Sequence, residues 1–434
     1  MKFPGRRKTR HYFPVGTKNR IPLDNYLIHN NRHDQNYITG IEQLLIDVEV
    51  NVTEEFLENF GITKGQSMVL DSGKVDRILS SLNEDQIVAE FAGGTIGNTL
   101  HNYSVLTDDR SVMLGTISET MSLGDCAFKY VCHTCSHVSF SYLQPLKGKM
   151  ARAICFITPD KERTFCISKG IMNDLDQSFI KEDVIKGSSA LLITAYLLRD
   201  EKAPIFKSTM KAVKIAKEHN VPVVLTMGTS ILLNEKKDFL IDFIKEYVNV
   251  AAMNDDEAFS LTGFKDHLLA GESILDMTDL TLITVGPKGL YLCGHVDKEH
   301  VRETKNKIHS KSIAEYNKFE YSRAMLKQHC KDPIKIYSHI NPFMGGPGQI
   351  KNTNGAGDAA LAAVLHDISA NSFHFKLQPS SPKHVAPFLT YSSLHQISKY
   401  ANRVSYEVLI QNSPRLSRGL PDKEDNLADG YWAM

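Results

Sequence analysis

Apolar segments alternate with amphipathic helix patterns through the middle of the chain. From residue 188 onward, continuous apolar runs predict buried strands at 190–196, 221–227, 248–253 and 280–285. Between them, apolar residues recur at helical spacing over 205–219 and 236–247. This alternation is typical of a parallel sheet whose two faces are covered by helices. The predicted fold class is therefore α/β, in which ligands bind beyond the carboxyl ends of the strands.

The remaining segments follow this pattern less closely. Before the regular region, we predict a strand at 37–50, short helices and turns over 53–90, a helix at 96–106 and a strand-rich stretch over 136–168. After it, residues 295–332 are charged, with a helical pattern around 313–327, and a polar loop at 371–387 precedes a last helix at 389–411. We interpret residues 1–36 as a polar extension, 37–434 as one domain and 295–350 as an insertion within it.

Composition excludes several classes of protein. Fifty basic and fifty acidic side chains cancel, so no global field attracts nucleic acid or an acidic membrane. The first twenty residues are basic but lack the apolar segment of a signal peptide, and we interpret them as a solvated arm, with a nucleic-acid contact as the alternative. No stretch approaches the ~20 apolar residues of a membrane span. Seven cysteines form no disulfide framework, which favours a reducing cytoplasm.

A pair of cysteines, Cys132 and Cys135, resembles half of a zinc site, with His137 nearby. A tetrahedral zinc site needs four ligands, and no second pair of cysteines or histidines stands at a matching spacing. We therefore expect no structural zinc.

The most specific chemical feature is the run NTNGAGD from Asn352 to Asp358, which leads directly into an apolar helix pattern. A turn of Gly355, Ala356 and Gly357 that opens a helix points backbone N–H groups at one spot, where the helix dipole also favours an anion. Asp358 falls in the first helical turn, within reach of that anion. Phosphoryl transfer needs this pairing of an anion cradle with a group that accepts a proton from an alcohol. A plain glycine turn before a helix is the alternative.

Two features in the first quarter of the chain have the chemistry of a ligand site. Asp47 lies near the end of an apolar strand pattern, where a lone carboxylate is unfavourable unless it is hydrogen-bonded. It could accept two ribose hydroxyls, or it could cap the following turn. A second glycine motif precedes the predicted helix at 96–106 and contains Gly93, Gly94, Thr95, Gly97 and Asn98. It would let a ligand approach the backbone closely, and a tight turn with a polar cap is the alternative.

Asn254 and Glu257 follow a predicted strand and share one face of the next helix. Their oxygens could hold a magnesium ion through water, because Mg²⁺ sheds water reluctantly. A capping box, with Asn254 as N-cap and Glu257 at the third helical position, is the alternative and fits well.

A glycine turn and two arginines complete the candidate chemistry. Thr284, Gly286 and Gly289 join two predicted strands, where the backbone could lie along nucleotide phosphates or form an ordinary hairpin turn. Arg163 on the strand-rich segment and Arg199 just past a strand could meet a phosphate or a base. A surface position is the alternative for both arginines.

Together and in order, these motifs resemble the ribokinase-like (PfkB) family of sugar and nucleoside kinases. The Gly-Gly, Asn-x-x-Glu and late Gly-Ala-Gly-Asp motifs of that family stand here at 93–94, 254–257 and 352–358, and the resemblance covers residues 37–415. Residues 45–98 resemble the nucleoside-binding end of adenosine kinases, and the start, insertion and tail of the chain resemble bacterial kinases of inosine and guanosine. One departure is Asn352, which stands where the family has an aspartate.

The resemblance implies a three-layer α/β/α domain with a mostly parallel sheet and a small β-rich lid built from residues of about 47–90 and 136–170. It implies an ATP-dependent nucleoside 5′-kinase that uses Mg²⁺ and converts inosine and guanosine to IMP and GMP. A monovalent cation such as K⁺ and a homo-oligomeric state are compatible with it.

The resemblance also assigns roles to residues. Asp358 would be the base that activates the 5′-hydroxyl, and the anion hole would consist of Gly355, Ala356 and Gly357. The nucleoside would be bound by Asp47 and by Gly40, Gly93, Gly94, Thr95, Gly97, Asn98, Arg163 and Arg199. ATP would be bordered by Asn254, Thr284, Gly286, Gly289, Asn354 and Asn402, and Mg²⁺ would be organised by Asn254 and Glu257.

Two alternatives stay open at this point. A kinase of adenosine or of a free sugar would share the same motifs, since no residue identifies the base. A purine sensor on an inactive kinase scaffold would explain the basic N-terminal arm, but the intact Asp358 and its glycine turn disfavour it.

Overall fold

The computed structural model describes residues 36–107, 109–160, 162–303, 316–343 and 349–420. Their central layer is a nine-stranded sheet. In order across the sheet, its strands are β16 (Pro333–Ile340), β15 (Leu290–Asp297), β14 (Leu280–Thr284), β13 (Val250–Asn254), β12 (Val223–Thr226), β11 (Leu191–Thr194), β1 (Tyr37–Ile41), β5 (Arg110–Leu114) and β7 (Val138–Ser139). Neighbours from β14 to β7 are parallel, whereas β15 and β16 pair antiparallel at one edge. The predicted α/β class with a mostly parallel sheet is confirmed.

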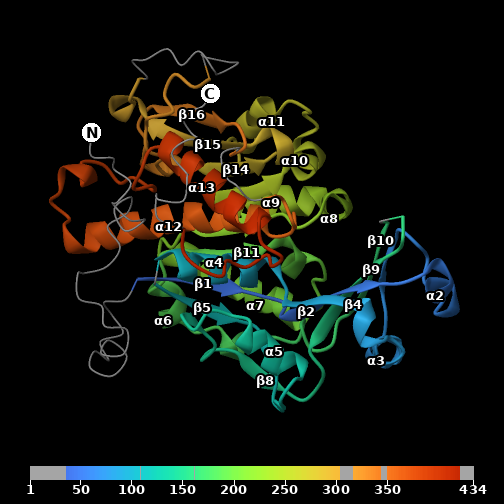
Figure 1. Ribbon diagram of the computed structural model, residues 1–434. Coiled ribbons are helices and arrows are strands. Elements are labelled where there is room, and N and C mark those ends of the chain that lie inside the picture. Colours follow the sequence, from blue (N-terminus) through green and yellow to red (C-terminus); the bar gives the residue numbers. More distant parts are fainter. Residues whose placement is uncertain (1–35, 108, 161, 304–315, 344–348, 421–434) are drawn as a thin grey trace.

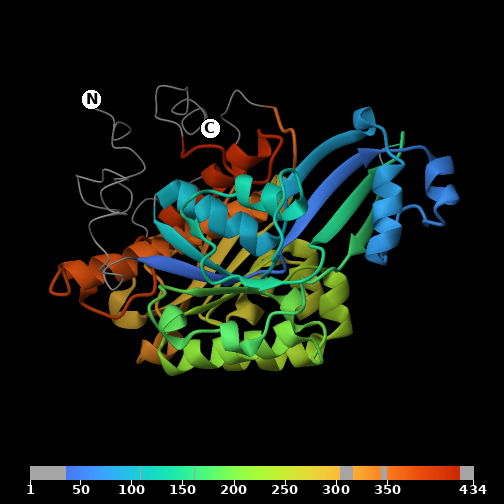
Figure 2. The ribbon, with the colours of Figure 1, turned by 90° about the horizontal axis from the view of Figure 1, so that it is seen from below.

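Helices cover both faces of this sheet, as Figure 2 shows. One face carries α4 (Thr95–Thr107), α12 (Ala356–Leu377) and α13 (Leu394–Leu409). The other carries α6 (Glu182–Lys186), α7 (Pro204–Glu218), α8 (Ser230–Glu235), α9 (Lys237–Tyr247), α10 (Asp255–Thr262) and α11 (His267–Ile274). Adjacent residues of β11 point into different cores, Leu192 into one and Ile193 into the other. Because both faces are buried, the strands are continuously apolar.

A second sheet extends to one side of the main sheet (Figure 1). Its order is β3 (Ser67–Val69), β10 (Arg163–Ser168), β9 (Ala151–Ile157), β2 (Leu45–Asn51) and β4 (Ile87–Ala92). The helices α2 (Glu54–Asn59), α3 (Ser72–Ser80) and α5 (Cys126–Cys132) lie beside it. One face is apolar, because Val48 and Phe156 pack with Leu57 of α2 and Ile78 of α3. The two ranges expected to form a lid supply most of this sheet, and its action as a lid stays a prediction. A third, two-stranded sheet pairs β6 (Thr116–Ser118) with β8 (Gln144–Leu146).

The strand expected at 37–50 is in fact two strands in different sheets. β1 ends at Ile41 and β2 begins at Leu45, so the short link between them joins the main sheet to the second sheet. The link contains Glu42, whose side chain bonds the backbone of α4 and so holds the chain where it changes sheet. Both strands are apolar, and hydrophobic pattern alone does not show such a division.

Three further predictions about elements were incomplete or wrong. The range 53–90 contains the strand β3 and most of β4 in addition to short helices. The described part of the helix expected around 313–327 is not an α-helix: residues 316–321 form turns and Met325 forms an isolated β-bridge. The backbone here bonds β15 and the residues before α13, since Met325 N donates to His295 O and Leu389 N donates to Ala324 O. The polar loop begins after Leu377 rather than at 371, since Asn371 is buried inside α12 and bonds Phe388 O.

The helices expected at 96–106, 205–219, 236–247 and 389–411 are confirmed as α4, α7, α9 and α13. The range described as an insertion contributes β16 to the main sheet, and residues 304–315 and 344–348 within it lie outside the described residues, as does the N-terminal arm through residue 35. Among the helices of the described ranges, none combines the length and the apolar character that a bilayer span requires.

Candidate active site

The long helix α12 begins at the carboxyl-end edge of the main sheet, and its N-cap residue is a glycine, which provides no side-chain cap. Its N-cap, Gly355, has φ 79°, and a Cβ there would lie 2.5 Å from Cβ of Pro414. Only glycine tolerates both the left-handed backbone and this close approach. The next glycine, Gly357, is exposed and faces Thr284 at the end of β14. The helix therefore presents uncapped N–H groups and the positive end of its dipole beside the β14–β15 turn, which suits an anion.

Asp358 lies in this first turn and is a half-buried residue. Its Oδ2 accepts a hydrogen bond from Asn98 Nδ2 of α4 at 3.0 Å. Burial raises the pKa of Asp358 to about 7, and the Asn98 bond and the Arg415 charge oppose this shift. The glycine motif of α4 and the motif of α12, which are far apart in the sequence, thus meet through this one bond.

Asp47 lies on β2 beside the turn that leads into α4. β2 pairs with β4 so that Gly93, directly after β4, donates its N–H to Leu45 O at 2.9 Å. A Cβ at Gly93 would overlap the carboxylate of Asp47, so the glycine leaves that carboxylate room. Burial raises the pKa of Asp47 to about 7, which the charge of Arg415 opposes. The charge of Asp47 also raises the pKa of Asp358 across the site.

Glu42 is a buried acidic residue of this region that the sequence analysis did not single out. It is 2% exposed, and its carboxylate accepts hydrogen bonds from Gly97 N at 2.7 Å and Gln43 N at 2.8 Å. It fixes the start of α4, and a Cβ at Gly94 would overlap it. Burial raises the pKa of Glu42 to about 8. An acidic residue directly after an apolar strand was the available signal.

Asn254 and Glu257 form the capping box that was the alternative explanation for their spacing. Asn254 Oδ1 accepts from Glu257 N at 2.8 Å, and Glu257 Oε2 accepts from Asn254 N at 2.9 Å. Glu257 is 6% exposed, and burial raises its pKa. The charge of its carboxyl group also raises the pKa of Asp358, so the start of α10 borders the same site. The capping role is confirmed, and metal binding at this place stays a prediction.

The β14–β15 connection is a tight turn at Gly286–Lys288, as expected for a hairpin. Gly286 is exposed and Gly289 is buried against the backbone of Ile340. Beside it, Asn354 is exposed and donates its N–H to Asn352 Oδ1 at 2.9 Å. Asn352 Nδ2 donates to Asn412 O at 3.2 Å, a bond that an aspartate at this position could not donate.

Other residues with an expected role lie elsewhere or have other partners. Gly40 is buried in β1 beneath Ile96 of α4. Arg163 is exposed at the start of β10, and Arg199 is exposed and 3.6 Å from Glu235. Asn402 of α13 is buried and donates to Asn341 O at 2.8 Å. Thr95 opens α4 next to Gly94 and is partly exposed.

Arg415, from the segment after α13, is the second residue that sequence reasoning missed. It is 4% exposed and reaches the centre of the site, where its Nε donates to Asn98 Oδ1 at 3.0 Å. Nothing in the local sequence marks it, because it lies in a polar tail rich in serine and arginine, 317 residues after its partner.

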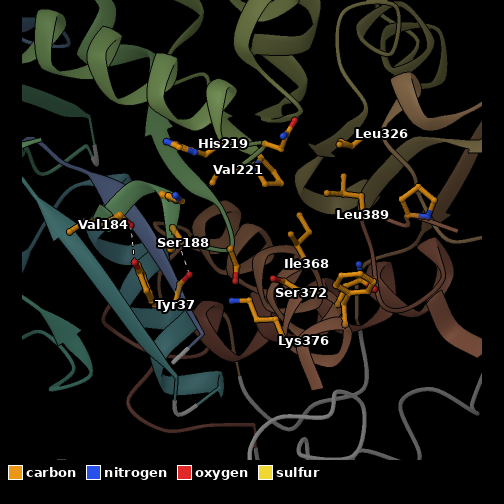
Figure 3. A pocket seen from close by; sticks show the side chains of 18 of the residues that line it. Tyr37, Val184, Ser188, His219, Val221, Leu326, Ile368, Ser372, Lys376 and Leu389 are labelled. Carbon is orange, nitrogen blue, oxygen red and sulfur yellow. Dashed lines mark hydrogen bonds between the residues drawn. The ribbon is translucent and has the colours of Figure 1, made fainter. Parts of the chain in front are cut away.

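A cavity of about 1080 Å³ lies at the opposite edge of the main sheet (Figure 3). It is lined by residues at the amino ends of strands, among them Tyr37 at the start of β1, Ser188 before β11 and Val221 before β12. None of the motif residues that meet around Asp358 lines it. This cavity is therefore separate from the motif residues, which meet at the carboxyl ends of the strands.

No family model matches the chain. It is 48% identical, over all 434 residues and the full length of both chains, to the guanosine-inosine kinase of Escherichia coli strain K12. Among solved structures, it is similar to an adenosine kinase from Sinorhizobium meliloti, with a TM-score of 0.64 and 20% identity over 89% of this chain and 97% of that one. A probable sugar kinase from Rhizobium etli has a TM-score of 0.64 and 17% identity over 89% and 96% of the two chains.

The two solved structures establish the fold, and the full-length relative establishes the family. The glycine motifs and Asp358 lie together at the carboxyl ends of the strands, where kinases of this fold are expected to hold their ligands. The chain therefore belongs to the guanosine–inosine kinase family of nucleoside kinases, built on the ribokinase-like fold.

Proposed function

We propose that this protein is an ATP-dependent 5′-kinase of inosine and guanosine, with IMP and GMP as products. The observation that carries the proposal is the position of Asp358 in the first turn of α12, where its carboxylate accepts a hydrogen bond from Asn98 beside the glycine N-cap. The proposal is supported by the full-length relative, which is a guanosine-inosine kinase.

In the proposed mechanism, Asp358 accepts the proton of the nucleoside 5′-hydroxyl. The 5′-oxygen forms a bond to the γ-phosphorus of ATP while the bond between that phosphorus and the bridging oxygen of ADP breaks. A pKa raised to about 7 suits a base that must take a proton at neutral pH. Positioning and electrostatic stabilisation supply most of the rate in such a reaction.

The phosphates of ATP fit the start of α12. The uncapped N–H groups of residues 356–358 would donate to the phosphoryl oxygens on which negative charge develops. Gly357 has no side chain to block them, and Thr284 lies directly alongside. The turn containing Gly286 and Gly289, with Asn354 and Asn402, would border the rest of the nucleotide.

The nucleoside fits the edge of the second sheet. Asp47 would accept hydrogen bonds from the ribose 2′- and 3′-hydroxyls, and Gly93, which has no side chain, leaves room for its carboxylate at the turn into α4. The backbone at Gly94 and the amide of Asn98 would orient the sugar so that its 5′-hydroxyl faces Asp358. The remaining residues with an expected nucleoside role, Gly40, Thr95, Gly97, Arg163 and Arg199, would act indirectly, by packing or at the rim of the site.

Magnesium fits the start of α10. The capping box occupies one oxygen of Glu257, and Asp255 and Asp256 add exposed carboxylates beside it. Glu257 and Asn254 would hold the ion through water, as expected for a metal that keeps much of its hydration. Bound there with ATP, it would neutralise phosphate charge. A monovalent cation such as K⁺ is compatible with this proposal.

The test is phosphoryl transfer from Mg·ATP to inosine, guanosine, adenosine, ribose and fructose 6-phosphate. We expect IMP and GMP, with little product from the other acceptors. Turnover of adenosine or of a sugar would reject the proposed substrates but keep the chemistry. Binding of ATP without any turnover would instead favour an inactive purine sensor.

A further inference from the structure

We propose that Arg415 is the positioning residue of the phosphoryl-transfer site, because its guanidinium holds the side-chain amide of Asn98 with the amide nitrogen facing Asp358. The inference rests on the proposed role of Asp358 as base. Arg415 acts on that base through Asn98, by setting the direction of a chain of hydrogen bonds that runs from the guanidinium to the carboxylate.

The direction of this chain follows from the donors and acceptors. An arginine side chain only donates, so Arg415 Nε at 3.0 Å commits the amide oxygen of Asn98 as acceptor. The amide nitrogen must then face the other way, where it donates to Asp358 Oδ2 at 3.0 Å. A flipped amide would place its NH₂ against the guanidinium and its oxygen against the carboxylate, and both contacts would repel. Arg415 therefore favours the ionised Asp358 that a base requires, and the chain occupies Oδ2 rather than Oδ1.

The guanidinium itself is held on several sides. Its Nη1 donates to Thr134 Oγ1 at 2.6 Å and to His133 O at 3.2 Å, both just after α5. Its Nη2 lies 3.5 Å from Gly93 O, next to Asp47. The guanidinium carbon lies 5.2 Å from the ring centre of Tyr130. A planar fork with this many fixed donors cannot be replaced by the single ammonium group of a lysine.

The backbone on both sides of Arg415 is bound to the same helix that carries Asn98. Asn102 Oδ1 accepts from Leu416 N at 2.8 Å, and Asn102 Nδ2 donates to Pro414 O at 3.2 Å. Asn98 and Asn102 are four residues apart and so share one face of α4. Pro414 also packs against Gly355 at the start of α12. The tail segment 414–416 thus links α4 to the anion-binding turn, and Arg415 stands at that junction.

Three acidic groups and one cation, Arg415, act on the charge of Asp358. The carboxyl groups are Glu257 from α10, Asp47 from β2 and Glu42 from the β1–β2 link. His101 of α4 lies near Arg415, but burial lowers its pKa to about 4, so it is neutral at physiological pH. The charge of Arg415 therefore offsets the mutual repulsion of carboxylates that would otherwise accumulate at the site.

The test is a double-mutant cycle on the nucleoside that the wild-type protein phosphorylates. We expect Arg415→Ala to lower kcat by about 10²-fold, as misplacement of a catalytic group does, with a smaller rise in the Kd of the nucleoside, because Arg415 also faces Asp47. In an Asn98→Ala background, Arg415→Ala should have little further effect, because the two residues act as one unit. Guanidinium ions in the assay should restore part of the activity of Arg415→Ala but none of the double variant. Arg418→Ala, an exposed arginine of the same tail, is the matched control and should keep wild-type kcat.

Three results would overturn the inference: wild-type kcat in Arg415→Ala, an equal loss of kcat with and without Asn98, or guanidinium rescue of the double variant. If Arg415→Ala does not fold, Arg415→Lys replaces it in the test. We expect Arg415→Lys to have a wild-type Tm and a reduced kcat. An unchanged kcat in this variant would overturn the inference. A wild-type protein without kinase turnover would overturn the proposed function as well. Full activity of Arg415→Ala would overturn only the role of Arg415.

Discussion

At the scale of single residues, the site is defined by carboxyl groups that are largely buried. Burial raises the pKa of Asp358 to about 7, so it is protonated over much of the mildly acidic range. A base must be ionised to accept a proton, and its ionised fraction falls as the pH drops through that pKa. We therefore expect kcat at saturating substrates to fall about tenfold per pH unit below pH ~7 and to level off above it.

The control for this pH dependence is Asp358→Asn, which should bind the nucleoside but lose turnover by a factor on the order of 10²–10⁴. The residual rate of this variant should not fall as the pH drops below about 7. Asp47→Asn should still show that fall in kcat, because Asp47 is expected to act in binding. A wild-type profile that stays flat well below neutral pH would argue against Asp358 as the base.

Ribose recognition makes a separate prediction for Asp47. Asp47→Ala should raise the Kd of the nucleoside about 10- to 100-fold, because hydrogen bonds to a charged group contribute about 1.5–3 kcal/mol, with a smaller effect on kcat. The variant should also no longer distinguish a nucleoside from its 2′-deoxy form, which calorimetric titration can measure. Glu49→Ala, two residues along the same face of β2, is the matched control. Unchanged affinity in Asp47→Ala would remove this residue from the sugar site.

The residues that sequence reasoning found and those it missed differ in a physical way. Asp358 and Asn98 stand in glycine motifs whose local geometry already points to anion or ligand binding. Glu42 and Arg415 act through partners brought close by the fold, since Glu42 bonds Gly97 and Arg415 bonds Asn98. No local pattern encodes contacts between residues that are 55 and 317 positions apart.

At the scale of elements, the start of α12 combines strain with close packing. Gly355 and Gly263 have nearly the same backbone, with φ 79° and 80°, but only Gly355 faces Pro414, whereas a Cβ at Gly263 would meet open space. Gly263→Ala should lower the free energy of unfolding by about 1–2 kcal/mol, the cost of a left-handed backbone. Gly355→Ala should lower it further and also reduce kcat. Equal stability of the two variants in urea unfolding would show that the Pro414 contact relaxes freely.

The capping boxes of α10 and α13 separate stability from metal binding. Asn254→Ala at α10 and Ser393→Ala at α13 remove equivalent caps, and each should lower the free energy of unfolding by about 1 kcal/mol. Only Asn254→Ala should raise the Mg²⁺ concentration needed for half-maximal activity. If both variants keep the wild-type magnesium dependence, the Asn254–Glu257 pair is a helix cap and nothing more.

At the scale of the whole molecule, the two sheets share few connections. The second sheet joins the main one through short links such as the one that contains Glu42. If it closes over the nucleoside as a lid, inosine should slow amide hydrogen exchange in β2, β4 and β9, while β12 and β13 in the main sheet serve as an internal reference. Equal protection of both sheets would contradict closure and indicate general stabilisation by the ligand.

The sequence by itself determined the layers of the fold and the centre of the chemistry. Continuous apolar strands separated by amphipathic helices require a sheet covered on both faces, and a glycine turn before a helix carries its anion-binding geometry within a few residues. Only the tertiary structure decided that residues 37–50 divide between two sheets, that β16 joins the main sheet, and that the tail places Arg415 beside Asn98. Periodicity and short motifs are local properties of the chain, whereas pairing, register and buried polar contacts depend on which distant segments pack together.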